Sequence, residues 1–383
     1  MSCGTLSDHP TPACDLHLHS CFSIASSSRM IPSFMISAAK KKGLSAIGSA
    51  DALHPGWRRM WEDAVPIDTE DGVIVVPSAE VEDSNRVHHL ILMEEFSSFS
   101  ELHAILEPVP KDLSHTGRPR LRIGGEEIAR RVHTLGGFIG PAHAFTPWTS
   151  LYARHNSVRE CYGEEPIDFL ELGLSADNSY GASIPDLQGI PFLSSSDAHG
   201  PDPGRLGREY TVLEVRELSP AGILESITGG HVIQNAGLFP EEGKYNRTAC
   251  SRCYRQYTLE EAGGLGWKCP DDGGKIKKGV RDRARELSCG SPHPRPPYRH
   301  LIPLPEIIRH VLSRKSSDCR DVRTLYEQFL ASFGDEIRVL THVPVPDLSR
   351  VHEDTAMAID SLRDGRVTLF PGGGGRYGTF SFE

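Results

Sequence analysis

The chain has 383 residues, of which 38% are hydrophobic and 24% charged, so it is long enough for two or three domains with ordinary packed interiors. Its net charge of −10 argues against nucleic-acid binding through overall charge. No apolar stretch is long enough to span a bilayer, and residues 1–12 do not resemble a signal peptide. Nine cysteines, an odd number, favour reduced thiols and metal ligation over a disulfide framework. We therefore expect a cytoplasmic protein with no membrane partner.

Short apolar runs in the first half of the chain each lead to side chains that bind metals. The first run leads to His17 and His19, and strand alternation puts both imidazoles on one face. Asp197 and His199 repeat this spacing after a later run. Imidazole and carboxylate ligands favour Zn²⁺ or Mn²⁺, and a carboxylate can bridge two ions. The sequence thus predicts one polynuclear metal site at strand ends, where an α/β barrel places its catalytic groups. The other run ends supply Asp51, Glu80, His89 and His143.

Charge is distributed unevenly along the chain. Residues 1–243 carry 18 Lys and Arg against 33 Asp and Glu, whereas residues 244–320 carry 17 against 8. A basic segment can supply salt-sensitive attraction to a nucleic-acid backbone, although a charge run is also typical of a solvated face. The candidate DNA-binding side chains in it are Lys275, Lys277, Lys278 and Arg281.

The same basic segment contains three quarters of a zinc ribbon. Cys250 and Cys253 form one knuckle, and Cys269 begins a second at the usual spacing. The fourth position is Asp272, whose carboxylate can ligate zinc. Cys289 or His293 could take its place if the following loop folds back, and a degenerate ribbon without metal is the remaining alternative.

The last third of the chain is predicted to be mainly helical. The Pro-rich residues 291–298 indicate a rigid connector, and apolar spacing then predicts three helices over 304–312, 322–333 and 356–362. Gly334 and Gly365 suit helix ends. Four glycines at 372–375 precede Arg376 and Tyr377, which either contact a phosphate and a base or belong to a flexible tail.

The metal-binding runs resemble the polymerase and histidinol phosphatase (PHP) superfamily over residues 14–215. This resemblance implies an α/β fold with a distorted (β/α)₇ barrel and a centre of two or three divalent ions, Zn²⁺, Mn²⁺ or Mg²⁺. One ion would be held by His17, His19, Glu80 and Asp197, with Glu80 bridging to a second. His89 and His143 would hold that second ion, with His89 preferred over its neighbour His88, and Asp51 with His199 would hold a third.

Further segments resemble the endonuclease Q family over nearly the full length. These segments are residues 80–89, 140–152, 171–177 and 196–201, the last followed by 205–209. The resemblance implies an N-terminal extension (1–13), a PHP barrel (14–243), a basic zinc-ribbon-like segment (244–290) with a structural Zn²⁺, and a helical C-terminal domain (291–383). It also implies a metal-dependent DNA repair endonuclease that cuts 5′ to uracil, hypoxanthine, xanthine or abasic sites and leaves 3′-OH and 5′-phosphate ends.

In that interpretation damaged DNA is the partner, and the catalytic residues are the metal ligands Asp197 and Glu80. A sliding clamp is a conceivable further partner, but the C-terminus has no clamp-binding motif. Two rival functions stay open: a small-molecule phosphatase of the histidinol phosphatase type, which needs only the barrel, and a DNA-binding scaffold without catalysis.

Overall fold

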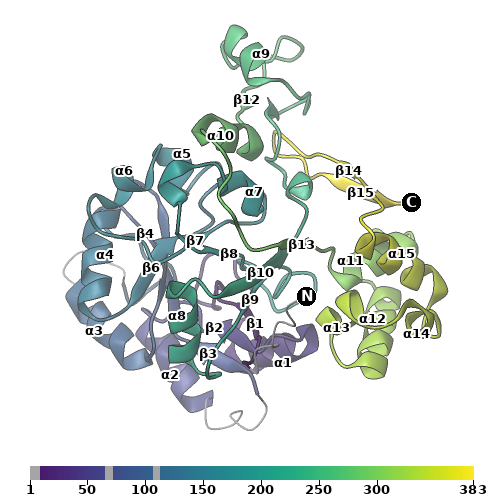
Figure 1. The fold of residues 1–383 in the computed structure, drawn as a ribbon, viewed down its shortest axis with the longest axis horizontal. Coiled ribbons are helices and arrows are strands. Elements are labelled where there is room, and N and C mark those ends of the chain that lie inside the picture. Colours follow the sequence, from purple (N-terminus) through teal and green to yellow (C-terminus); the bar gives the residue numbers. More distant parts are fainter. Residues whose placement is uncertain (1–8, 65–71, 107–112) are drawn as a thin grey trace, which may run out of the picture.

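The computed structural model describes residues 9–64, 72–106 and 113–383 (Figure 1). Its largest sheet has six strands, in the order β13 (Tyr298–His300), β10 (Val232–Gly237), β9 (Tyr210–Leu213), β1 (Ala13–Asp15), β2 (Ala46–Gly48) and β3 (Ile74–Val76). Strands β1, β2 and β3 are parallel, whereas β9 is antiparallel to both of its neighbours. The parallel strands end at the same edge of the sheet, and side chains that follow them therefore come together.

Two smaller sheets complete the α/β part. Antiparallel β4 (Ser78–Glu82), β5 (His88–Leu92) and β6 (Phe138–Pro141) form one, and parallel β7 (Leu170–Glu171) and β8 (Phe192–Leu193) form the other. Single backbone hydrogen bonds join neighbouring sheets, such as Ala52 N to Ser78 O at 2.9 Å. Among the described residues, the strands of the α/β part form three open sheets and not the closed barrel that was predicted. A closed barrel requires each strand to pair with a neighbour on both sides, whereas β7 and β8, with two residues each, have ladder pairing only with each other.

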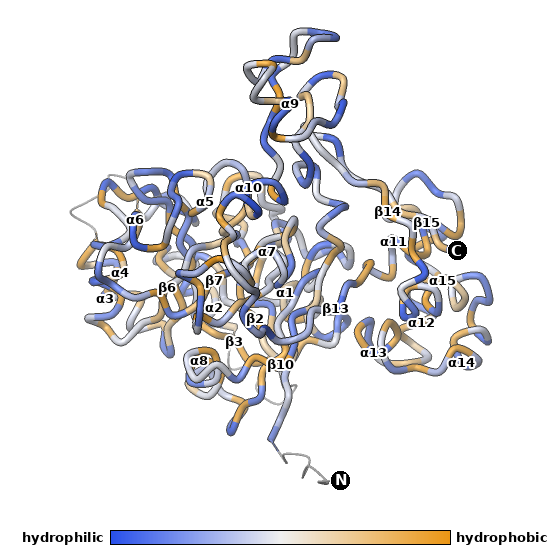
Figure 2. The backbone as a smooth tube through the Cα atoms, turned by 45° about the horizontal axis from the view of Figure 1, so that its top comes forward, coloured by the Kyte–Doolittle hydropathy of each residue, from blue (hydrophilic) through white to orange (hydrophobic). Residues whose placement is uncertain are grey.

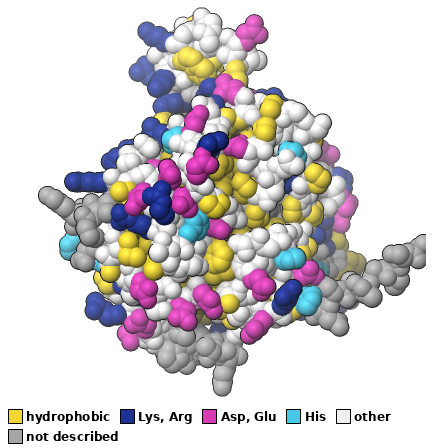
Figure 3. Space-filling view, turned by 60° about the vertical axis from the view of Figure 1, so that its left-hand side comes forward, with side chains coloured by type: hydrophobic (Ala, Val, Ile, Leu, Met, Phe, Trp, Pro, Cys, Tyr) yellow, Lys and Arg dark blue, Asp and Glu magenta, His cyan; other side chains and the backbone are white. Residues whose placement is uncertain are grey.

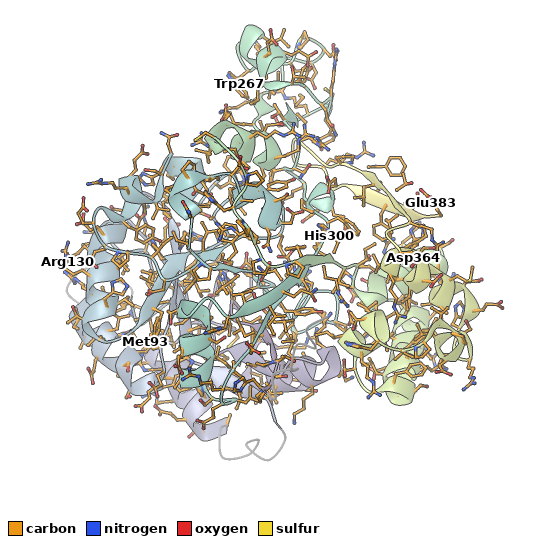
Figure 4. The ribbon with its side chains drawn as sticks, viewed as in Figure 1. Met93, Arg130, Trp267, His300, Asp364 and Glu383 are labelled. Atoms are coloured by element: carbon orange, nitrogen blue, oxygen red, sulfur yellow. The ribbon has the colours of Figure 1, made fainter. Side chains whose placement is uncertain are left out.

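Helices surround these sheets (Figure 1). In α4, Ile128 and Val132 are buried one turn apart, while Arg130 points outward and pairs with Glu126 at 3.1 Å (Figure 4). None of the helices in the described ranges is long and apolar enough to cross a membrane. The helices of this part are α1 (Pro32–Lys42), α2 (Pro55–Ala64), α3 (Phe96–Leu106), α4 (Gly125–Thr134), α5 (Leu151–Arg154), α6 (Val158–Tyr162), α7 (Asn178–Gly181) and α8 (Pro220–Thr228), with 3₁₀ turns at Pro185–Leu187 and Pro240–Glu242.

A small segment projects from the α/β part, at the top of Figures 1 and 2. This ribbon segment, residues 244–290, contains β11 (Ala249–Cys250), α9 (Leu259–Gly264), β12 (Ile276–Lys277) and α10 (Val280–Leu287). Its own apolar cluster is small, and Trp267 packs against it (Figure 4). Val280 and Ala284 of α10 instead join the core of the α/β part. Helix α10 thus attaches the ribbon segment to that core.

The C-terminal part has the three predicted helices as α11 (Leu304–Val311), α12 (Arg320–Phe333) and α15 (Glu353–Arg363). Gly334 ends α12 at φ 98° and Gly365 follows α15 at φ 69°, both left-handed conformations that favour glycine. The sequence did not indicate two short helices, α13 (Glu336–Thr341) and α14 (Val345–Ser349), or the hairpin of β14 (Val367–Phe370) and β15 (Thr379–Phe382).

This helical part packs directly on the α/β part. One apolar core contains Leu18 and Ile47 together with Phe329 and Ile359. The prediction of a helical domain from residue 291 differs from the structure at its start, because β13 pairs with β10 of the large sheet. His300, the last residue of β13, marks this junction in Figure 4.

The four glycines near the C-terminus form a turn against the ribbon segment. The backbone N–H of Arg247 donates to the carbonyl of Gly372 at 3.0 Å, and that of Gly375 donates to Lys244 at 2.9 Å. A Cβ at Gly374, where φ is 68°, would lie 2.1 Å from the carbonyl oxygen of Cys250. Glycine is therefore needed here for close backbone approach. The alternative of a flexible tail does not describe this loop.

Candidate metal centre

The first ligand group joins the ends of β1 and β8. His17 and His19 follow β1, and Asp197 follows β8; one ligand atom from each lies within 4.8 Å of the others. Nε2 of His19 is 2.9 Å from Oδ1 of Asp197, and Nε2 of His17 is 3.9 Å from the same oxygen. The structure thus brings these three side chains together, and their role as metal ligands stays a prediction.

The second group contains Glu80, His88 and His143. Oε1 of Glu80 lies 2.7 Å from Nδ1 of His88 and 3.0 Å from Nε2 of His143. The same carboxylate is 3.7 Å from Nε2 of His17 and 3.5 Å from Nε2 of His19. Glu80 thus lies between the two groups, where a bridging carboxylate belongs.

The structure corrects the choice of histidine on β5. His89 was expected in the centre, but His88 lies there, because successive residues of a strand point to opposite faces. Nδ1 of His89 is instead 2.6 Å from the hydroxyl of Tyr162, and Nε2 is 3.5 Å from Asp83. His89 belongs to a separate buried cluster.

Asp51 and His199, expected to hold a third ion, lie beside the first group. Oδ1 of Asp51 is 3.7 Å from Nδ1 of His19, and the His199 ring lies tilted against the His19 ring, with 4.1 Å between the centroids. The other carboxylate oxygen of Asp51, Oδ2, accepts hydrogen bonds from the backbone N–H of Ser20 and the hydroxyl of Ser23, at 2.8 Å each. Within the described ranges neither residue joins a group of three ligands, and the third site stays a prediction.

Backbone strain accompanies three of the ligands. Asp51, His143 and Asp197 have φ of 27°, 33° and 47°, a region that residues with a Cβ rarely adopt. Each follows a strand of the α/β part, where the chain turns sharply. Such strain persists only where the surrounding structure imposes it, and it is concentrated at functional sites.

The centre pairs buried imidazoles with buried carboxylates. Burial by itself would lower the pKa of both His17 and His19. Nearby carboxylates outweigh this effect: Glu171 helps to raise the pKa of His17 to about 9, and Asp197 helps to raise that of His19 to about 10. Burial alone would raise the pKa of Glu80, yet His88 and His143 hold it well below its ordinary value. Since metals bind neutral imidazole, ion binding must release protons from this centre.

Two further side chains of the centre were not assigned from the sequence. Oε2 of Glu171 lies 2.8 Å from Nδ1 of His17, and an Nη atom of Arg118 donates to Oε2 of Glu80 at 3.0 Å. Glu171 ends the apolar strand β7, a signal that could have found it by the rule applied to Glu80. Arg118 lies in a loop, where no periodicity points to it.

The ribbon segment brings its four candidate ligands together. One ligand atom from each of Cys250, Cys253, Cys269 and Asp272 lies within 4.8 Å of the others. Sγ of Cys250 is 3.3 Å from Oδ1 of Asp272, and the sulfurs of Cys253 and Cys269 are 3.7 Å apart. Cys289 and His293 are not alternatives, since their backbone N–H groups bond Ser183 and Ala182 beside α7.

A cavity of about 860 Å³ extends from the metal centre towards the ribbon segment and the C-terminal hairpin. His143, Glu171 and Asp197 lie at one end of its lining, and Lys244 and the exposed Tyr377 also line it. Trp148 also lines the cavity, and Nζ of Lys277 lies over its ring, 4.3 Å from the centroid. Figure 3 shows Lys and Arg side chains along one side of the projecting segment.

The predicted DNA-binding residues differ in exposure and pairing. Lys275 and Arg376 are exposed. Nζ of Lys278 is 2.7 Å from Glu286, and Arg281 is 3.2 Å from Asp282, so these two cations have carboxylate partners.

Together, the fold and these two linked groups define an α/β protein with a candidate centre for divalent metal ions. Residues 303–366 match the family described as the MJ0043 C-terminal domain. Over 69% of its length the chain is 45% identical to protein MJ0043 of Methanocaldococcus jannaschii, of which it spans only 36%. It is 34% identical to YqxK of Bacillus subtilis, with 77% of this chain and 74% of that protein aligned.

Two solved structures match nearly the whole chain. The lesion-specific endonuclease PfuEndoQ of Pyrococcus furiosus has a TM-score of 0.93 at 44% identity, covering 97% of this chain and 96% of that one. Endonuclease Q in complex with a 27-mer duplex with an abasic lesion at the active site has a TM-score of 0.92 at 43% identity, covering 98% and 97%. The chain belongs to the endonuclease Q family.

Proposed function

We propose that this protein is a metal-dependent DNA repair endonuclease. It cuts the phosphodiester bond on the 5′ side of uracil, hypoxanthine, xanthine and abasic sites, and it leaves 3′-OH and 5′-phosphate ends. The observation that carries the proposal is the match over 97% of the chain, at 44% identity, to a lesion-specific endonuclease. The metal centre opening into a large cavity supports it.

The residues of the centre fit divalent ions. Nε2 of His17 and Oδ1 of Asp51 are buried without a hydrogen-bond partner, an arrangement that a bound cation would satisfy. Imidazole nitrogens and carboxylate oxygens suit Zn²⁺ and Mn²⁺, and carboxylates also suit Mg²⁺. Two or three such ions would supply an acidified water and positive charge for the phosphate.

The chain's own side chains position this chemistry. Glu171 orients His17 by holding Nδ1, and it also accepts the backbone N–H of His143 at 2.8 Å. Asp197 and Glu80 are the proposed catalytic ligands, since both face the space shared by the two groups. Arg118, only partly buried, adds a cation beside Glu80 that can meet a phosphate oxygen.

The cavity suits an unstacked nucleotide. Trp148 and Tyr245 lie edge to face at 5.8 Å on its wall, and Tyr377 is exposed beside them. Aromatic faces stack on bases, and a base lifted out of the duplex can be read in such a pocket. Lys244 lies 5.6 Å from the ring centroids of both tyrosines, and its ammonium group would meet the backbone of a strand whose bases stack there. The remaining proposed DNA contacts are Lys275, Lys277, Lys278, Arg281 and Arg376.

A small-molecule phosphatase is a weaker interpretation of this geometry. The ribbon segment and the hairpin contribute Lys244 and Tyr377 to the cavity lining, and a phosphatase would have no need of either. A scaffold without catalysis is disfavoured by the intact ligand groups.

We also propose a structural Zn²⁺ in the ribbon segment, with Asp272 as fourth ligand. Asp272→Cys should retain this zinc against a chelator better than the native chain, because thiolate binds Zn²⁺ strongly, and Asp272→Asn should retain it less well. Zinc release followed with a colorimetric chelator measures both. Equal release from all three proteins would remove Asp272 from the site.

The function is tested with labelled duplexes that contain one uracil, hypoxanthine or abasic site, incubated with Mg²⁺, Mn²⁺ or Zn²⁺. A single cut 5′ of the lesion is expected, with undamaged duplex left intact. Asp197→Asn should bind the damaged duplex and fail to cut it, whereas Asp318→Asn, an exposed Asp outside the ligand groups, should cut normally. Folded, metal-loaded protein that cuts none of these duplexes would overturn the proposal.

A further inference from the structure

A second buried cluster lies on the opposite face of β5 from the metal centre. It consists of Asp83, His89 and Cys161, with one ligand atom from each within 4.8 Å of the others. His89 and Asp83 have no exposed surface and Cys161 is 7% exposed. Nε2 of His89 lies 3.5 Å from Oδ2 of Asp83, a separation too long for a good hydrogen bond.

Nε2 of His89 and Oδ2 of Asp83 face each other in this cluster, and neither atom has a hydrogen-bond partner. The other polar atoms of both side chains are occupied. Oδ1 of Asp83 accepts the backbone N–H groups of Asn85 and Val87 at 2.8 Å each, and Nδ1 of His89 is 2.6 Å from the Tyr162 hydroxyl. A buried polar atom without a partner is costly. Nε2 of His17 shows the same feature inside the metal centre.

We propose that Asp83, His89 and Cys161 bind one structural Zn²⁺ ion, separate from the metal centre and from the ribbon segment. Nitrogen, oxygen and sulfur donors together match the ligand set of zinc. The Tyr162 hydroxyl at Nδ1 of His89 is the outer partner that a ligating imidazole usually has, and it leaves Nε2 free for the ion. This inference does not depend on the proposed nuclease activity.

Helix α4 closes the cluster. A Cβ at Gly125, the first residue of α4, would lie 2.8 Å from Sγ of Cys161 and 3.0 Å from Cε1 of His89. The nearby helix N-terminus would stabilise the thiolate form of Cys161 once an ion was bound. Burial raises the pKa of the Cys161 thiol, so an ion would have to displace its proton. Such an ion would fix α6 and the loop after β4 to β5, the strand that carries His88.

Zinc content tests the proposal. Native mass spectrometry and elemental analysis of the full chain, purified with zinc, should show one equivalent fewer in Cys161→Ser and in His89→Gln than in the native protein. Cys289→Ser is the matched control, because Cys289 is exposed and outside the ligand groups of the described chain. Equal zinc in all four proteins would show that His89 only hydrogen-bonds Asp83, and it would overturn the proposal.

Cobalt substitution gives a second readout, and its first step leaves Asp83, His89 and Cys161 unchanged. A protein with Cys253→Ser and Cys269→Ser loses two of the three ribbon thiolates, and Cys250→Ser added to it removes the third. Loaded with Co²⁺, this triple variant should keep a sulfur-to-cobalt charge-transfer absorption, which Cys161→Ser then abolishes. Absence of that absorption in the folded triple variant would also overturn the proposal.

Discussion

Oε2 of Glu171 lies 2.8 Å from Nδ1 of His17, and it also accepts the backbone N–H of His143 at 2.8 Å. One carboxylate therefore contacts a residue of each ligand group without belonging to either. Glu171 ends β7, which is separated from β1 and β6 by sheet boundaries. The hydrogen bonds of this side chain thus join three sheets at the centre.

Glu171→Gln should weaken metal binding and cutting by about 10- to 100-fold, because a neutral amide orients His17 less firmly and lowers its basicity. Removing the carboxylate charge should also lower the pKa of His17, which Glu171 raises to about 9. Calorimetric titration with Mn²⁺ and single-turnover cutting measure the two effects. Glu164→Gln, on the exposed surface, is the control; equal metal affinity in both variants would contradict the role of Glu171.

His88 and His89 form a matched pair of neighbours with different expected roles. His88→Gln should reduce cutting by at least about 100-fold, because it removes a ligand 2.7 Å from Glu80. His89→Gln should leave the chemical step within a few-fold of the native rate once the protein is folded, since its side chain points away. Single-turnover rates at saturating metal decide this, and the reverse ranking would restore His89 to the metal centre.

The sequence indicated which strand-end side chains lie together, because period-two alternation and apolar runs are local features. Thus His17, His19, Glu80, His143 and Asp197 meet as expected. The choice between His88 and His89 failed because it depends on strand register, and a one-residue shift reverses the face. Arg118 reaches Glu80 from an irregular loop, and only tertiary packing sets such a contact.

The same limit applies to the fold as a whole. Helices α11, α12 and α15 were predicted because their apolar periodicity is strong, whereas α13 and α14 are too short to show one. The glycines at 372–375 indicated an unusual backbone conformation. They did not indicate which segment this backbone approaches, which is Cys250 in a strand far away in the sequence. Such long-range partners leave no local pattern.

Lys42 and Glu336 should be a major attachment of the helical part. Nζ of Lys42 lies 2.8 Å from Oε1 of Glu336, with side chains only 4% and 1% exposed. Glu336→Gln leaves a buried ammonium group without its counter-charge and should cost about 3 to 5 kcal/mol in urea unfolding. The neighbouring exposed pair Lys41 and Glu327 is the control, and Glu327→Gln should cost less than about 1 kcal/mol. Similar losses in both variants would contradict this attachment.

Glu242 should make the protein less stable as pH rises. Burial, reinforced by nearby Glu306 and Glu241, raises its pKa from 4.5 to about 7. Because the folded-state pKa lies above the unfolded value, this group's contribution to stability is complete below about pH 4.5 and is lost as pH rises through 7. Between pH 5 and 8 the native protein should lose on the order of 2 kcal/mol more than Glu242→Gln, since the carboxyl is partly exposed. Urea unfolding at both pH values measures this, with exposed Glu217→Gln as control; parallel curves for the native protein and Glu242→Gln would contradict it.

Lys277 should contribute to DNA affinity through charge and not through lesion choice. Its Nζ lies 4.3 Å from the centroid of the Trp148 ring, and Trp148 lines the metal-centre cavity. Lys277→Ala should weaken binding to damaged and undamaged duplexes by the same factor, because a phosphate contact carries no base information. The slope of log affinity against log salt should fall by about 1. Fluorescence anisotropy over a salt series measures both quantities, with exposed Lys315→Ala as the control. A loss confined to damaged duplex, with an unchanged slope, would instead place Lys277 in lesion recognition.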